Sequence, residues 1–205
     1  MDLFNCACYY YKDYPASSLR LIALDAIHYG SAQHRWFVSV LADAAQKGYA
    51  VIAAQHYPAQ SGIVPINCGF SDMDLTIDAV ATPQKGGQMS RMPKEAFAAV
   101  DSFIDNGGQF VCWLSGHTHL DYIGLVKGHE RQLQVMVDKA GEVDQYMQED
   151  RTHGTRFQDS FNLVTVNPSR KILVIDRIGC DRDQYLRSKK LFVYNYAERR
   201  VLATE

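Results

Sequence analysis

The most informative segment spans residues 110–119 and reads FVCWLSGHTH. It begins with five consecutive apolar residues, a run whose length and aromatic content are typical of a buried β-strand. Alternate residues of an extended segment point to the same side, so His117 and His119 are expected to face one common region. Gly116 has no side chain and leaves room there for a ligand or another stretch of backbone. The segment therefore predicts a buried strand that brings two imidazoles to its carboxyl end.

Two further apolar runs of strand length precede this segment, at residues 19–24 and 49–54. Between them, apolar residues recur at three- and four-residue steps over residues 32–47, which predicts an amphipathic helix. Ser31 is expected to cap the start of this helix, and Gly48 is expected to end it. The pattern is that of a strand, a helix and a second strand.

A second helix is predicted to begin at Pro93, because proline suits the first turn of a helix. Its buried stripe is expected to consist of Phe97, Val100 and Ile104, and an Asn-Gly-Gly sequence at residues 106–108 ends it. With the strand that follows, the order is strand, helix, strand, helix, strand. Such alternation indicates a layered α/β sheet.

The amino-acid composition of two other stretches predicts a long loop and an additional strand. Residues 59–91 are rich in Gly, Pro, Ser and Gln and predict a long loop, with a short element near residues 75–80. Loops of this length commonly form lids or binding loops. Near the start of the chain, residues 6–11 are rich in aromatic residues and predict an additional strand.

The chain after residue 120 has the pattern of β-structure. Residues 161–166 and 172–178 flank an Asn-Pro-Ser-Arg turn and predict a hairpin. Asp176 and Arg177 are expected on its exposed face, and residues 191–196 predict a last strand. We therefore expect an α/β fold, a layered β-sandwich of two mixed sheets flanked by helices.

Length and charge restrict the class of protein. A chain of 205 residues fits one domain, expected to span residues 1–205. Lys and Arg number 21 and Asp and Glu number 23, which gives a net charge of −2. There is no basic surplus of the kind that nucleic-acid binding needs, so we do not expect a nucleic-acid partner. No run approaches the roughly 18 apolar residues of a membrane span, so we expect no membrane association.

Cysteine usage indicates the compartment. The five cysteines are scattered, and no two of them form a Cys-x-x-Cys pair, which argues against a disulfide framework or a thiolate zinc site. Cys112 lies inside an apolar run and is expected to be a small buried residue. The first five residues lack the basic and apolar regions of a secretory signal. These features predict a reducing compartment, the cytoplasm.

A third histidine ends the strand at residues 49–54. His56 follows this strand after one residue, and ligands of open α/β sheets bind beyond the carboxyl ends of strands. If the two strands are parallel neighbours, His56 meets His117 and His119 at one edge. Three neutral imidazoles can hold zinc or a similar ion and leave one position open for water. The alternative is that all three are hydrogen-bonded turn residues at strand ends.

These residues resemble a known family in their order along the chain. The segment Gly116-His117-Thr118-His119 resembles the Gly-His-x-His block of calcineurin-like metallophosphoesterases, and His56 resembles the isolated histidine that precedes it. Residues 33–37, Gln-His-Arg-Trp-Phe, follow Asp25 closely and resemble the family's Gln-x-x-Trp-Leu helix.

The resemblance implies a function. The family hydrolyses phosphate monoesters or diesters by metal-bound hydroxide, on two β-sheets flanked by helices. The substrate implied is a small phosphate ester, and the cofactors are divalent metal ions (Mn, Fe or Zn). By resemblance, His56 and His117 would hold one metal ion and His119 the other.

The chain also departs from the family. The family's earlier blocks, Asp-x-His, Gly-Asp and Gly-Asn-His-Asp, are absent, since none of the 14 glycines is followed by Asp or Asn. The segment from Asp25 to His28 has one residue too many for Asp-x-His. We therefore expect the C-terminal portion of a metallophosphoesterase domain. Two ions about 3.5–4 Å apart need carboxylates to offset their repulsion, so we expect this chain to hold at most one ion, weakly.

Two other readings stay open. A non-catalytic remnant of the domain would act as a binding or dimerisation module, and the sheet edges left by a missing half predict a homodimer. A hydrolase with a single zinc ion on three histidines is the third reading. It predicts one metal ion per chain and activity without a carboxylate ligand.

Overall fold

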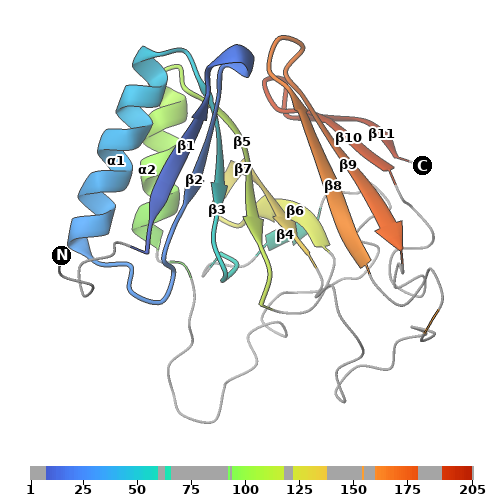
Figure 1. The fold of residues 1–205 in the computed structure, drawn as a ribbon, viewed down its shortest axis with the longest axis horizontal. Helices are drawn as coiled ribbons and strands as arrows, with labels where there is room; N and C mark the ends of the chain where they lie inside the picture. Colours follow the sequence, from blue (N-terminus) through green and yellow to red (C-terminus); the bar gives the residue numbers. More distant parts are fainter. Residues whose placement is uncertain are drawn as a thin grey trace.

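The structure is a computed structural model. It describes residues 8–59, 63–65, 92, 94–117, 122–137, 154, 160–179 and 191–204. This part of the chain forms an α/β fold with two sheets, one mixed and one antiparallel, and two α-helices (Figure 1). The coarse prediction of an α/β sandwich is confirmed, although the second sheet is antiparallel rather than mixed.

The first sheet has seven strands in the order β1-β2-β3-β5-β7-β6-β4. Strands β2, β3, β5 and β7 run parallel to one another. Their carboxyl ends therefore share one edge of the sheet. The bounds of the seven strands are β1 Tyr10–Tyr14, β2 Leu19–Ala23, β3 Ala50–Ala54, β4 Ile63–Pro65, β5 Gln109–Ser115, β6 Tyr122–Val126 and β7 His129–Met136.

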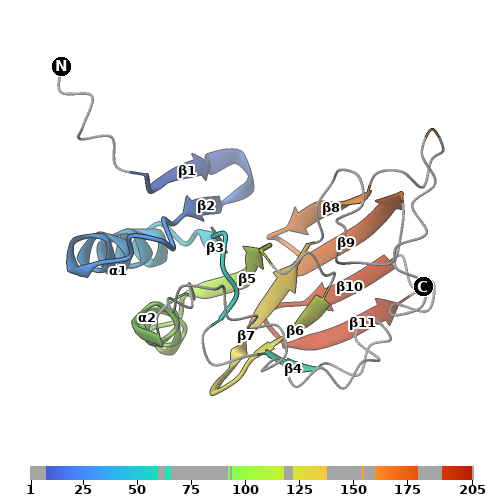
Figure 2. The same ribbon diagram turned by 90° about the horizontal axis from the view of Figure 1, so that it is seen from below.

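Two helices, α1 (Ser31–Gln46) and α2 (Lys94–Asp105), cover one face of this sheet, and the second sheet lies on the other side (Figure 2). Both helices bury aromatic residues against Trp113 of β5, whose ring centroid lies 6.1 Å from that of Phe37 and 4.9 Å from that of Phe97. Ser31 is the first residue of α1 rather than its cap. Gly30 occupies the capping position without a side-chain hydrogen bond.

The second sheet has the order β11-β10-β9-β8 and is antiparallel throughout. Its strands are β8 Ser160–Asn167, β9 Ile172–Gly179, β10 Leu191–Asn195 and β11 Arg200–Thr204. Cys112 of β5 is fully buried in the cluster between the two sheets, as predicted, together with Ile175 and Phe192 of the second sheet. Burial also raises the pKa of the Cys112 thiol.

The predicted hairpin is confirmed, because β8 and β9 pair in unbroken register. One detail of it is wrong. Asp176 is exposed, but Arg177 is 4% exposed and donates a hydrogen bond to Oδ1 of Asn162 over 3.2 Å. The hydrogen bond to Asn162 on the neighbouring strand β8 thus allows the guanidinium of Arg177 to be buried.

Other differences concern the ends and the loops. The first described strand is β1, which begins four residues later than the predicted strand at residues 6–11. Strand β4 lies within the predicted loop at residues 59–91. The short element near residues 75–80 and the helix start at Pro93 lie outside the described residues.

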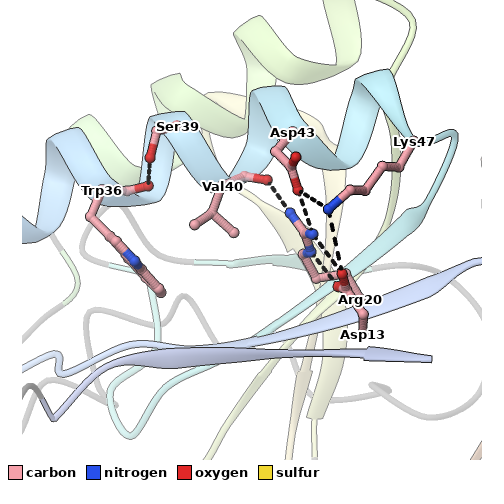
Figure 3. A network of polar contacts seen from close by, with 7 residues as sticks. All are labelled: Asp13, Arg20, Trp36, Ser39, Val40, Asp43 and Lys47. Carbon is pink, nitrogen blue, oxygen red and sulfur yellow. Dashed lines mark hydrogen bonds and ion pairs between the residues drawn. The ribbon is translucent and has the colours of Figure 1, made fainter. Parts of the chain in front are cut away.

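A buried charge joins α1 to the sheet (Figure 3). The guanidinium of Arg20 on β2 is fully buried, donates to both carboxylate oxygens of Asp13 on β1 over 2.6 and 2.8 Å, and donates to Oδ2 of Asp43 on α1 over 2.6 Å. It also donates to the carbonyl oxygen of Val40 over 2.7 Å. The hydrogen bond from Arg20 is the main reason why the pKa of Asp13 lies below its usual value.

Within the described residues, no helix has both the length and the apolar character needed to span a bilayer.

Candidate functional site

The candidate site lies at the carboxyl edge of the parallel strands. Backbone hydrogen bonds continue past the strand ends, from Gln55 N–H to the Leu114 carbonyl over 2.9 Å and from Gly116 N–H to the His56 carbonyl over 3.1 Å. These bonds fix the residue after β3 beside the residue after β5. The two histidines that follow these strands are therefore held next to each other.

His56 and His117 lie in direct contact. Nε2 of His56 is 3.2 Å from Nδ1 of His117, and the ring centroids are 5.0 Å apart at an interplanar angle of 72°. Tyr57 packs against both rings, with centroid distances of 4.8 Å to His56 and 4.4 Å to His117. His56 is exposed, whereas Tyr57 is buried and forms the inner wall of the pair. The third predicted ligand, His119, lies outside the described residues.

The backbone of His117 is strained. Its φ is +69°, in the left-handed region that costs an L-residue about 1–2 kcal/mol. Ser18, Lys171 and Arg199, the other non-glycine residues with positive φ in the described part of the chain, lie in turns. His117 instead directly follows a buried strand and Gly116. Strain of this kind at a polar residue is common where a side chain is aimed for binding or catalysis.

The two ring nitrogens fit one cation. Two nitrogen ligands of a tetrahedral zinc ion, each about 2.0–2.1 Å from the metal, lie about 3.3 Å apart. The separation of 3.2 Å between His56 Nε2 and His117 Nδ1 is close to that distance. Without a cation, one nitrogen donates a hydrogen bond to the other. Within the described residues, no group of three or more His, Cys, Asp or Glu is arranged to hold a metal ion, so this pair supplies two ligands.

Asp25, at the end of the neighbouring strand β2, is committed to its own turn. Its Oδ1 accepts hydrogen bonds from the N–H groups of Ile27 and His28, and its Oδ2 lies 2.9 Å from Nδ1 of His28. Burial alone would raise the pKa of Asp25, but the hydrogen bonds from His28 and Ile27 outweigh it and the pKa is lowered. This carboxylate is therefore occupied within its own turn.

Gln33 holds the same turn in place from α1. Its side chain is 2% exposed, its Nε2 donates to the Asp25 carbonyl over 3.0 Å, and its Oε1 accepts from the Asp25 N–H over 2.8 Å. The glutamine of the Gln-x-x-Trp segment thus has a physical role, since it fixes the end of β2.

Gln55 was not singled out from the sequence. Its side chain is 8% exposed, and neither Oε1 nor Nε2 has a hydrogen-bond partner in the described part of the chain. A buried amide without partners costs free energy, so such groups are usually explained by a bound water, ion or ligand. The only sequence signal was its place, directly after a buried strand and before His56.

In comparisons with known proteins, no family model matches the chain and no curated protein matches it significantly.

Proposed function

We propose that the chain belongs to a metal-dependent phosphoesterase and contributes the histidine side of its metal site. The observation that supports this most is the pair His56 and His117, 3.2 Å apart at the ends of adjacent parallel strands, with His117 held in a strained backbone conformation. The arrangement agrees with a metallophosphoesterase-like sandwich, of which the chain would be the C-terminal portion.

Each residue has a part in this proposal. His56 and His117 would hold a divalent ion (Mn, Fe or Zn), with His119 as a further donor. When bound, such an ion acts as a Lewis acid toward a phosphate ester and lowers the pKa of a bound water. Tyr57 keeps both rings in place and closes their buried side. Among the described residues, the nearest atom to a Cβ at Gly116 would be the Val137 carbonyl oxygen at 3.8 Å, so these residues leave space at the edge.

A small phosphate ester is the substrate class that fits the charge of the chain. The net charge of −2 offers no basic surplus for a polyanion such as a nucleic acid. The scattered cysteines agree with a cytoplasmic location, which is part of the same proposal.

A second candidate function follows from the missing carboxylates. Asp25, which follows the end of β2 after one residue, is bound to its own turn, and the described residues form no group of three or more metal-ligating side chains. On this reading the chain is a non-catalytic metallophosphoesterase remnant that acts as a binding or dimerisation module. It predicts metal binding without turnover, or no dependence on metal at all.

The experiment compares metal binding and turnover in the same preparations. Calorimetric titration with Mn²⁺ and Zn²⁺ measures binding, and release of p-nitrophenol from its phosphate monoester and diester measures hydrolysis. We expect His56→Ala and His117→Ala to lose both. His34→Ala, a histidine of α1 that contacts Tyr29, is the control and should keep them.

The outcomes separate the candidates. Turnover that disappears in His117→Ala supports the hydrolase. Metal binding that depends on both histidines without turnover supports the non-catalytic module. If neither metal binds the unaltered chain, or if His34→Ala is affected as strongly as His117→Ala, the metal-site proposal is wrong.

A further inference from the structure

Strand β8 differs from the other three sheet edges, and we propose that it is the surface through which two copies of this chain associate. An unpaired edge strand exposes a row of backbone N–H and C=O groups that can pair with another strand. Most proteins protect such edges with charges, proline, bulges or short strands. The two described sheets have four edge strands, β1, β4, β8 and β11.

Three of the edge strands have features that disfavour pairing with a further strand. Strand β1 contains Lys12 and Asp13, and β4 has three residues and contains Pro65. Strand β11 begins with Arg200, and its pairing with β10 contains a bulge that skips Leu202. Each of these edges is therefore a poor template for a further strand.

Strand β8 has none of these features. Its eight residues, Ser-Phe-Asn-Leu-Val-Thr-Val-Asn, include no charged residue and no proline. It pairs with β9 in unbroken register from Ser160 opposite Gly179 to Asn167 opposite Ile172. On its other side, no strand of the described part of the chain is paired with it. At about 3.4 Å per residue, this edge of the described sheet is about 27 Å long.

The outer face beside the first half of this edge carries three exposed apolar side chains, with the exposed Asp176 of β9 opposite Leu163. Phe161 and Leu163 lie two residues apart on β8 and are 52% and 51% exposed, and Ile178 of β9 lies opposite Phe161 and is 39% exposed. These three residues form the apolar patch of the β8 edge. Cross-strand contacts between apolar side chains are what stabilises strand pairing, so the patch would add to the backbone bonds.

A second copy of the chain suits this surface. When β8 pairs antiparallel with β8 of a copy about a two-fold axis perpendicular to the sheet, residues of the same face meet, so the patches of both copies become neighbours. Because β8 is uncharged, this self-pairing brings no like charges opposite each other within the strand. Asp176, the nearest acidic residue in register, lies one strand away from the edge.

The size of the surface sets the expected strength. Stable dimers bury about 800 Å² on each partner, and one strand edge about 27 Å long, with a strand spacing of about 4.8 Å, covers less than that. We therefore expect a reversible dimer with a dissociation constant of about 1–100 μM. This inference concerns the second sheet, and it stands or falls independently of the metal site.

Sedimentation equilibrium of the full chain over a range of concentrations tests the inference. The unaltered chain should show a monomer–dimer equilibrium. Phe161→Lys places a charge at the edge twice in each dimer, opposite the apolar Ile178, and should raise the dissociation constant about tenfold or more. Leu163→Lys lies opposite Asp176, which can pair with the new charge, so it should raise the dissociation constant by a smaller factor. Leu202→Lys is the matched control, because it changes an exposed leucine on the opposite edge strand and should leave the dimer unchanged.

Far-ultraviolet circular dichroism confirms that each variant is folded, as expected for substitutions of exposed side chains. A chain that stays monomeric at all concentrations would overturn the inference. So would a dimer that persists in Leu163→Lys and Phe161→Lys, or one that Leu202→Lys disrupts equally. No metal or substrate is present in these measurements, so their failure is distinct from failure of the phosphoesterase proposal.

Discussion

The indole Nε1 of Trp113 donates a hydrogen bond to Oε1 of Gln132 over 2.8 Å, and both side chains are fully buried. The amide nitrogen of Gln132 in turn donates to the carbonyl oxygen of Phe97 and to Oδ1 of Asp101, each over 2.8 Å. One side chain on β7 thus satisfies the indole of β5 and ties both strands to α2. These hydrogen bonds lie between the helices and the first sheet, where Trp113 and Phe97 belong to the apolar core.

The first prediction concerns these hydrogen bonds. Gln132→Leu leaves the Trp113 N–H buried without a partner, and we expect the free energy of unfolding to fall by about 2–3 kcal/mol. Urea denaturation measures the change. Trp113→Phe removes the donor, so the double variant should be less destabilised than the sum of the two single variants. Additive effects would show that the hydrogen bond contributes little.

The second prediction concerns the acid stability of the Arg20 cluster, which consists of Arg20, Asp13, Asp43 and Lys47. The pKa values of Asp13 and Asp43 lie below their usual range, chiefly through the Arg20 hydrogen bond for Asp13 and through the Lys47 hydrogen bond, followed by that of Arg20, for Asp43. Carboxylates with lowered pKa stabilise the fold above their unfolded pKa of about 3.9, and this stabilisation is lost as the pH falls through the folded pKa. We expect Asp13→Asn to cost about 1–3 kcal/mol at pH 7 and progressively less below about pH 4.

The control for this prediction is an exposed pair. Asp105 also has a lowered pKa, because Arg131 donates a hydrogen bond to it, but its side chain is 62% exposed. Solvent screens such pairs, so Asp105→Asn should change stability little at any pH. If Asp13→Asn and Asp105→Asn lower the free energy of unfolding equally at pH 7, burial of Arg20 does not strengthen its ion pairs, and the prediction is wrong.

Strong periodicity explains which elements could be predicted from the sequence. The apolar runs of β2, β3 and β5 and the helical spacing in α1 and α2 each point to one kind of element, and the structure confirms them. Strand β7 was missed because its sequence, HERQLQVM, places polar residues where buried strands usually have apolar ones. Gln132 and Gln134 are both fully buried, since each finds hydrogen-bond partners on other elements. Such partners are distant in sequence, so no local pattern reveals them.

The same limit applies to buried charges and to the candidate site. Arg20 lies within an apolar run, and nothing nearby in the sequence shows that Asp13 and Asp43 neutralise it. The contact between His56 and His117 followed from strand order, because parallel neighbours end at one edge. The unsatisfied amide of Gln55 depends on what surrounds it in three dimensions, and its sequence position alone gives no sign of that.

The third prediction compares two glycines. A Cβ added at Gly108 would overlap the buried ring of Phe103, whereas one added at Gly116 would have, among the described residues, the Val137 carbonyl oxygen as its nearest atom, at 3.8 Å. We expect Gly108→Ala to cost about 1–3 kcal/mol by overpacking, and Gly116→Ala to change stability by less than about 0.5 kcal/mol. Thermal denaturation measures both. If Gly116→Ala is the more damaging change, the open space described at the histidine pair is absent.

The last prediction separates function from stability at His117. Its φ of +69° costs about 1–2 kcal/mol, which glycine would avoid, while glycine adds about 0.5–1 kcal/mol of backbone entropy cost. From these two backbone effects alone, His117→Gly should leave the metal-free protein equally stable or up to about 1.5 kcal/mol more stable. His56→Gly gains no such relief, since the positive φ is at His117, and it should be destabilised by about 0.5–1 kcal/mol.

These two variants are matched, because each removes an imidazole that contacts the other histidine and Tyr57. Both should weaken Zn²⁺ and Mn²⁺ binding in calorimetric titrations, so the same loss of binding would accompany opposite effects on stability. That combination is expected only where a strained residue is kept for its side chain rather than for packing. If His117→Gly is destabilised as much as His56→Gly, then packing holds His117 in place, and its backbone strain gives no support to a metal site.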